Sequence, residues 1–242
     1  MNLQTAAHWY AASEEESGSE KEIEMKERTE NYLKMAVGFF LAFVVYTILI
    51  KVIDVRAIGP LFSKVGFSHL NDWVRDIVGH HKNWYTVSQF LGYLAIAVCV
   101  CFACTGAYQL FTGKKGLKSV SRGIWAVGGL YVALAIIYIF FDKVLVINYR
   151  PVLGTESILE PSYPSSHTLL AVCVFLSASD QASRMIDRTD IASSISIICW
   201  VAAAVTVLSR ILSGMHWITD IFGALILSAS LLFFYLAGAG DR

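Results

Sequence analysis

Long uncharged apolar stretches recur along the chain, and they constrain its fold more than any other feature. A helix that crosses a bilayer needs about 20 mainly apolar residues, and six stretches of this kind follow residue 34. They lie at residues 35–50, 83–113, 123–141, 161–179, 191–209 and 217–240. The sequence therefore predicts an all-α fold, a bundle of six transmembrane helices, although the first residues of the fourth stretch are too polar to face lipid.

The charged residues divide the chain into two parts. Charged side chains make up only 16% of the sequence, against about 25% in soluble domains, and 12 of the 38 lie in the first 34 residues. We expect an acidic N-terminal tail at 1–34 and a six-span membrane domain at 35–242. Three pairs of opposite charge four residues apart favour a helix over 20–34 that extends the first span: Glu22 with Lys26, Glu24 with Arg28, and Glu30 with Lys34.

The balance and placement of charge indicate partners and orientation. Lys and Arg equal Asp and Glu at 19 each, which excludes the broad basic surface that nucleic-acid binding requires. Eleven of the 19 basic residues lie on the side of the six-span arrangement that holds both termini. Because cytoplasmic loops retain positive charge, we expect both termini in the cytoplasm and the protein in the plasma membrane.

Two further features have mainly structural interpretations. About 30 mixed residues between the first two spans contain Trp73 and Trp84, which suits an amphipathic segment at the outer interface, acting as a plain anchor or as a guide for lipids. Cys101 and Cys104 form a C-x-x-C, but no second pair and no nearby histidine accompany it. We interpret all five cysteines as small buried apolar residues and expect no metal.

Ionisable and polar residues form three segments at the ends of predicted spans. Such residues near membrane depth are costly and usually functional or paired. The segments read Lys143-x6-Arg150-Pro151, Pro164-Ser165-Ser166-His167 and Ser209-Arg210-x5-His216-x3-Asp220. Alternation of the spans predicts that all three lie on the non-cytoplasmic face.

This ordered set resembles the type 2 phosphatidic acid phosphatase (PAP2) family, whose motifs read K-x6-R-P, P-S-G-H and S-R-x5-H-x3-D. Every spacing is kept over residues 143–220, and the one departure is Ser166, where the family usually has glycine. The resemblance implies a membrane lipid phosphatase without metal or cofactor. It also implies that His216 attacks phosphorus to form a phosphohistidine, while His167 protonates the departing lipid oxygen and then activates water.

The residue types support the same chemistry. Phosphoryl transfer requires positive charge around the phosphoryl oxygens, which Lys143, Arg150 and Arg210 supply. If the third span continues as a helix, the seven-residue spacing places Lys143 and Arg150 on one face. Ser165, Ser166 and the backbone N–H groups that open the fourth span add neutral donors. We expect these groups to form a phosphate-binding cradle.

A histidine and a carboxylate four residues apart suit nucleophile activation. Asp220 follows His216 by four residues, so on a helix the two share a face. The carboxylate then fixes the imidazole tautomer and stabilises its protonated form. The sequence predicts His216, His167 and Asp220 as the catalytic residues.

The leading hypothesis is an integral membrane phosphatase that hydrolyses a lipid phosphate monoester or pyrophosphate, of the polyprenyl pyrophosphate or phosphatidate type, with the lipid tail entering from the bilayer. One alternative is a lipid phosphotransferase that uses the same site. A second is a transporter that uses the buried charges for binding and relay, although the first two spans lack the ionisable residues that such a carrier needs.

Overall fold

The regular structure of the chain is helical. The computed structural model describes residues 3–153 and 158–240, with side chains at residue 18 and from residue 20 onward. The long helices are α1 (Leu3–Val52), α2 (Ser68–Val78), α3 (Lys82–Thr112), α4 (Arg122–Ile139), α5 (Ser166–Met185), α6 (Thr189–Ser213) and α7 (Ile218–Ala239). Shorter turns are η1 (Pro60–Phe62), η2 (Gly116–Ser119) and the π-helical η3 (Phe140–Val144). The described residues hold no strand beyond two isolated bridges, which confirms the all-α prediction.

Among the described residues, five helices are long and apolar enough to cross a membrane: α1 from Glu20, α3, α4 with the turn that follows it, α6 and α7. Helix α5, in place of the expected fourth span, is not among them, so the predicted count of six is not confirmed. Twelve of the twenty residues of α5 are buried, and the helix contacts α3, α4, α6 and α7. Because its neighbours are protein rather than lipid, α5 accommodates polar residues such as Ser177 and Gln181.

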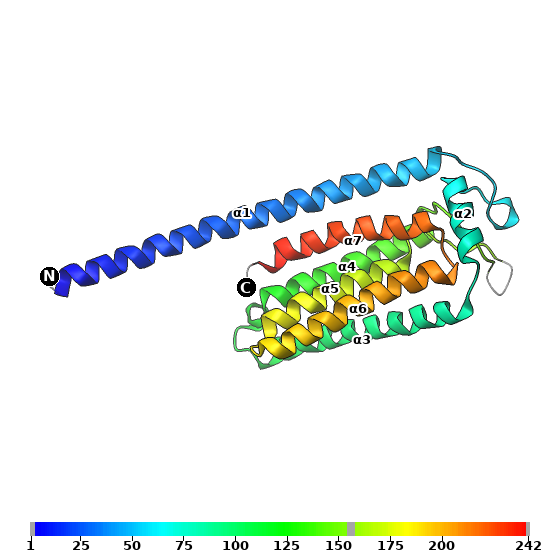
Figure 1. The fold of residues 1–242 in the computed structure, drawn as a ribbon. Coiled ribbons are helices and arrows are strands. Elements are labelled where there is room, and N and C mark those ends of the chain that lie inside the picture. The colour runs from blue at the N-terminus through cyan, green and yellow to red at the C-terminus, as the bar shows by residue number, and fades with distance from the viewer. Residues whose placement is uncertain (1–2, 154–157, 241–242) are drawn as a thin grey trace.

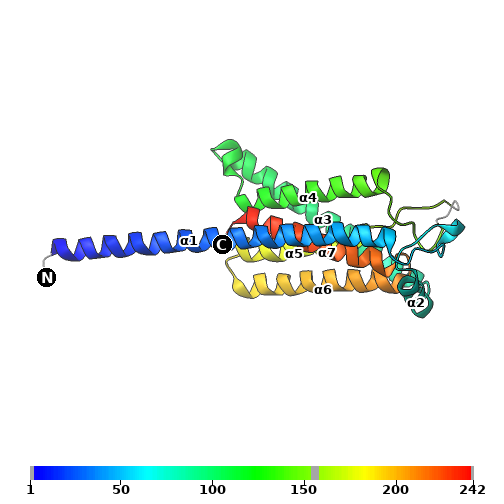
Figure 2. The same cartoon turned by 90° about the horizontal axis from the view of Figure 1, so that it is seen from above.

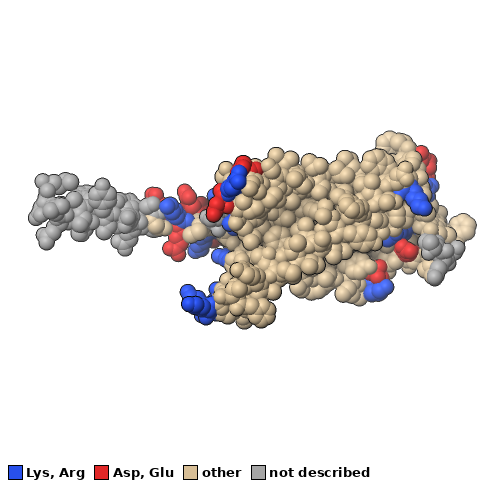
Figure 3. Space-filling view, turned by 90° about the horizontal axis from the view of Figure 1, so that it is seen from below, with Lys and Arg blue, Asp and Glu red and all other residues tan. Residues whose placement is uncertain are grey.

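The bundle consists of parallel and antiparallel helices, with α1 packed along α7 and extending well beyond it (Figures 1 and 2). Ala36, Phe43 and Ile50 are buried on the inner face of α1 at intervals of seven residues. The Ser230 hydroxyl of α7 donates to the Ala36 carbonyl at 2.8 Å. Charged side chains gather toward the ends of the molecule and leave a wide uncharged band between them (Figure 3), as a membrane-spanning bundle requires.

Helix α1 passes through residue 34 without a break. The predicted helix over 20–34 is therefore confirmed. The division into an acidic cytoplasmic tail at 1–34 and a membrane domain at 35–242 stays a prediction.

Helix α2 lies across the end of the bundle opposite the N-terminus (Figure 1). Its exposed side carries Leu70, Trp73 and Ile77, which recur at helical spacing. On its buried side the Asn71 amide donates to the Gly66 carbonyl at 2.8 Å and to the Thr219 hydroxyl at 3.0 Å. The expected amphipathic segment is thus present, and it is attached to the start of α7.

The cysteines differ from the expectation in part. Cys173 and Cys199 are buried and Cys99 is half-buried, but Cys101 and Cys104 are exposed on α3. The interpretation of all five as buried is wrong for these two, because this face of α3 is turned away from the other helices. In a membrane their small apolar side chains would contact lipid instead.

Candidate active site

The third motif lies at the junction of α6 and α7. Arg210 is in the last turn of α6 and is fully buried. Helix α6 is followed by Gly214, which has a φ of +65° and lies so near the Gly79 carbonyl that a Cβ would come within 2.0 Å of its oxygen. Only glycine suits this left-handed, crowded position. The tight turn brings His216 back beside Arg210 before α7 begins.

Asp220 is fully buried in the first turn of α7 and faces His216. One carboxylate oxygen accepts a hydrogen bond from the Asn148 amide at 2.9 Å, and the other accepts one from the Trp217 backbone N–H at 3.1 Å. The second oxygen, Oδ2, lies 3.6 Å from His216 Nδ1. The structure therefore brings the predicted pair together, although His216 precedes α7 rather than lying on it.

Arg210 contacts the opposite edge of the imidazole. Its guanidinium nitrogen NH2 lies 2.5 Å from His216 Nε2. Because arginine is only a donor, Nε2 accepts this bond, and the ring proton is on Nδ1, toward Asp220. Burial lowers the pKa of His216 well below its ordinary value, and the positive charges of Arg210 and Arg150 lower it further. The imidazole is therefore neutral with a lone pair on Nε2, the form that a nucleophile requires.

Residues 145–150, which carry the end of the first motif, are not helical. Helix α4 ends at Ile139 and is followed by the π-helical turn Phe140–Val144. Beyond it, an isolated bridge pairs Tyr149 with Pro161, and the Trp217 indole donates to the Tyr149 carbonyl at 2.7 Å. The expectation that Lys143 and Arg150 share a helix face is wrong, because the backbone at 148–150 bonds to distant segments instead of to its own preceding turn.

The two cations of the first motif have different surroundings. Arg150 lines the central cavity and forms an ion pair with Glu160 at 3.2 Å. The Lys143 side chain is 76% exposed and pairs with Asp142 at 2.8 Å. Asp142, and not Lys143, lines the cavity. The structure thus brings Arg150 to the site, but the Lys143 side chain, also predicted to bind phosphate, lies outside the cavity.

The second motif opens α5. Ser165 is fully buried, and its hydroxyl donates to the Thr168 hydroxyl at 3.0 Å, so this predicted phosphate ligand does not line the cavity. Ser166 and His167 line the cavity, and His167 Nδ1 is buried without a hydrogen-bond partner. Gly92 of α3 faces this ring, and a Cβ there would lie 3.1 Å from His167 Cδ2.

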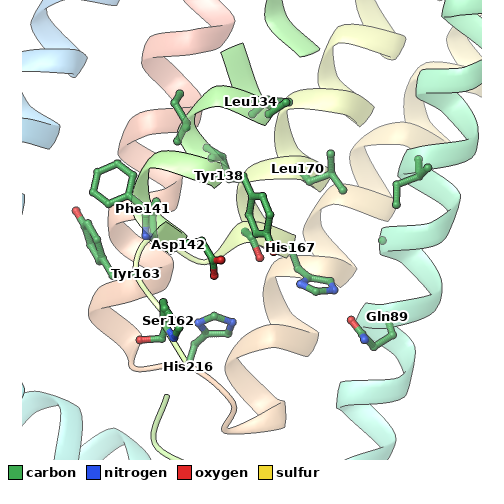
Figure 4. Close-up of a pocket in the computed structure, with 18 of the residues that line it drawn as sticks. Gln89, Leu134, Tyr138, Phe141, Asp142, Ser162, Tyr163, His167, Leu170 and His216 are labelled. Atoms are coloured by element: carbon green, nitrogen blue, oxygen red, sulfur yellow. The ribbon is translucent and has the colours of Figure 1, made fainter. Parts of the chain in front are cut away.

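A cavity of about 660 Å³ joins these residues to the side of the bundle (Figure 4). At its polar end lie Arg150, Ser166, His167 and His216. The cavity then continues between α3, α4 and α5 along apolar side chains such as those of Ile96, Leu134 and Leu170. It reaches Tyr93 and Tyr138, which are 68% and 54% exposed on the outer surface of the bundle.

Sequence reasoning missed several polar residues of the site. Asn148 lies within the first motif and Asp142 directly before it. Both are polar residues at the end of a predicted span, and this could have identified them as candidates. Ser88 donates to the Tyr85 carbonyl and accepts from Arg210, and Gln89 lines the cavity. Ser88 and Gln89 could have been identified as candidates because they are polar residues within an otherwise apolar span.

Comparisons with known proteins bear on the family and on the fold. A model of the PAP2 superfamily matches residues 93–242. Among solved structures, the fold is similar to that of a transmembrane PAP2 type phosphatidylglycerolphosphate phosphatase from Bacillus subtilis, with a TM-score of 0.56 and 17% sequence identity over 84% of this chain and 94% of that chain. No curated protein matches the sequence.

Proposed function

Because the chain belongs to the PAP2 superfamily, we propose that it is an integral membrane phosphatase that hydrolyses a lipid phosphate monoester or pyrophosphate. The observation that carries this proposal is the cavity. Its polar end holds a neutral histidine beside cationic side chains, and its other end is apolar and opens on the flank of the bundle. A phosphate headgroup suits the first environment, and a lipid chain suits the second.

In the first step, His216 Nε2 attacks phosphorus and the bond from phosphorus to the lipid oxygen breaks. The substrate phosphate takes the Arg210 N–H donor from Nε2, which frees the lone pair for attack. His167, protonated once the negative phosphate offsets the charges of Arg150 and Arg210, donates this proton to the departing lipid oxygen and becomes neutral. Asp220 faces the Nδ1–H edge of the ring and balances the positive charge that develops on the imidazole.

In the second step, water attacks the phosphohistidine and restores the enzyme. His167, now neutral, accepts a proton from this water. The bond from phosphorus to Nε2 breaks and inorganic phosphate leaves. One histidine thus acts first as acid and then as base, while the other carries the phosphoryl group.

The cations supply the electrostatic part of catalysis. Arg150 and Arg210 offer planar donor groups that match phosphate oxygens, and Ser166 adds a neutral donor at the start of α5. We propose that Lys143 exchanges Asp142 for a phosphate oxygen when substrate binds, and that Ser165 acts by shaping the first turn of α5. With this positive charge from side chains, the reaction requires no metal ion.

The position of the site in the bundle suggests how the chain is oriented in the membrane. The site lies at the end of the bundle that holds α2, whereas the extension of α1 and the end of α7 lie at the other end (Figure 1). We propose that both termini are cytoplasmic and that the site faces the opposite side of the plasma membrane. We also propose that α5, which the other helices enclose, crosses the membrane and brings the number of spans to six.

We expect a bulky residue in the apolar part of the cavity to impair only substrates with long chains. Ile96 lines the cavity and is half exposed on α3, so Ile96→Trp should lower kcat/KM for a long-chain lipid phosphate by at least about tenfold, because the tail can no longer hold the headgroup in register. Hydrolysis of a short-chain, water-soluble phosphate should stay within about twofold of the unmodified protein.

The matched control for this prediction is Val100→Trp. Val100 lies one turn further along α3, is similarly exposed and does not line the cavity. Equal effects of the two substitutions, or equal effects of Ile96→Trp on both substrates, would contradict entry of the lipid chain by this route.

The proposed function is tested by phosphate release from purified protein in detergent, with EDTA present. The panel includes polyprenyl pyrophosphate, phosphatidate and phosphatidylglycerolphosphate. We expect at least one of these to release phosphate, with polyprenyl pyrophosphate and phosphatidate as the leading candidates. Addition of an acceptor lipid separates hydrolase from phosphotransferase, since a transferase would form a phosphorylated acceptor in place of free phosphate. Absence of both products would overturn the proposal.

A further inference from the structure

Helix α3 presents a polar stripe to the site from a segment that precedes the family-matched residues 93–242. The stripe consists of Tyr85, Ser88 and Gln89, and Gly92 follows them at the spacing of the same helix face. Much of the remaining surface of α3 is exposed and apolar, as at Phe90. Polar groups on a membrane-spanning helix usually face a partner or a functional cavity.

Ser88 is fully buried, and its hydroxyl both donates and accepts a hydrogen bond. It donates to the Tyr85 carbonyl at 2.8 Å and accepts from the Arg210 guanidinium nitrogen NH1 at 3.1 Å. The Tyr85 ring lies below the same guanidinium, with its centroid 5.7 Å from Arg210 Cζ. Two neighbouring residues of α3 therefore fix the group that contacts His216.

The two groups of α3 that contact Arg210, the Ser88 hydroxyl and the Tyr85 ring, are both neutral. Arg150 is paired with Glu160, but no carboxylate of the described residues forms an ion pair with Arg210. A carboxylate partner would position the guanidinium and also offset its positive charge. A hydroxyl and an aromatic ring position it and leave the charge available to an anion.

We propose that Ser88, supported by Tyr85, is a positioning residue that holds Arg210 ready for the phosphoryl group. The proposal rests on the proposed phosphatase function and adds α3 to the three sequence motifs. Ser88 keeps NH1 in place while a phosphate oxygen replaces His216 at NH2. The guanidinium therefore meets the phosphate already oriented, which is what electrostatic stabilisation of a transition state requires.

The first test compares Ser88→Ala with Thr86→Val. Thr86 is exposed on α3, and its hydroxyl donates to the Lys82 carbonyl of its own helix, so Thr86→Val is the matched loss of a hydroxyl. Loss of one hydrogen bond to a charged group should lower kcat/KM for the lipid phosphate about tenfold in Ser88→Ala. It should weaken the binding of orthovanadate, a transition-state-like oxyanion, by a similar factor. Thr86→Val should stay within about twofold in both measurements.

The second test is a double-mutant cycle with Arg210→Met, read by the shift in melting temperature on orthovanadate binding. If Ser88 acts through Arg210, Ser88→Ala should change vanadate affinity by less than about twofold once Arg210 is absent. An equal effect of Ser88→Ala in both backgrounds, or no effect in either, would overturn the inference. The vanadate measurement does not depend on hydrolysis, so failure of the phosphatase proposal would be seen separately, as a lack of phosphate release by the unmodified protein.

Discussion

Replacement of His216 by alanine is expected to abolish phosphate release from every lipid substrate, with a fall in kcat of at least about 10³-fold. The imidazole is buried, neutral and oriented between Asp220 and Arg210, so no other described side chain can take its place as a nucleophile at that position. The measurement is initial-rate phosphate release in detergent with the most active lipid of the panel.

The control for this variant is His81→Ala, which alters an exposed histidine at the same end of the bundle. That variant should stay within about twofold of the unmodified protein. Monodisperse elution of both variants would show that neither is unfolded. Retention of more than about a tenth of the rate by His216→Ala would contradict the proposed nucleophile.

Replacement of His167 by alanine is expected to separate the two chemical steps. A lipid alkoxide is a poor leaving group, so loss of the general acid should lower kcat for the lipid by about 10²- to 10⁴-fold. The leaving group of p-nitrophenyl phosphate departs without a proton, so phosphorylation of His216 by this substrate should continue. Water attack still lacks its base, so the phosphorylated enzyme should accumulate.

The measurement is the time course of p-nitrophenol release by His167→Ala. We expect a burst close to one equivalent of protein, followed by slow turnover. His216→Ala should show no burst, because it has no nucleophile to phosphorylate. A His167→Ala variant that loses activity equally on both substrates, with no burst, would show that His167 does not act as the acid and base.

The fold was predictable from sequence where the signal is local. An uncharged stretch long enough to cross the bilayer is a property of adjacent residues, and the corresponding helices α3, α4, α6 and α7 are present. The fourth stretch was ambiguous for a physical reason. Residues 161–165 precede the helix, and α5 is enclosed by protein, so its composition resembles that of a soluble core helix more than that of a lipid-facing span.

The site was predictable as a set of residues but not as a geometry. The contact between His216 and Asp220 could be predicted from their spacing, because residues four apart at the start of a helix lie close together. The conformation around Arg150 depends on Pro161 and Trp217, which are distant in sequence. The contact of Ser88 with Arg210 joins residues 122 positions apart. Spacing within a motif carries no information about such pairs.

The central claim is that the phosphoryl group passes through His216, and it is tested most directly by trapping the intermediate. The protein is mixed with a lipid substrate that carries a radiolabelled phosphate, in the presence of EDTA, and quenched rapidly in alkali, in which phosphohistidine survives. The account predicts label on the peptide that contains His216, lost on treatment with acid and absent from His216→Ala. Turnover by the unmodified protein without labelled protein, or label on a different residue, would contradict it.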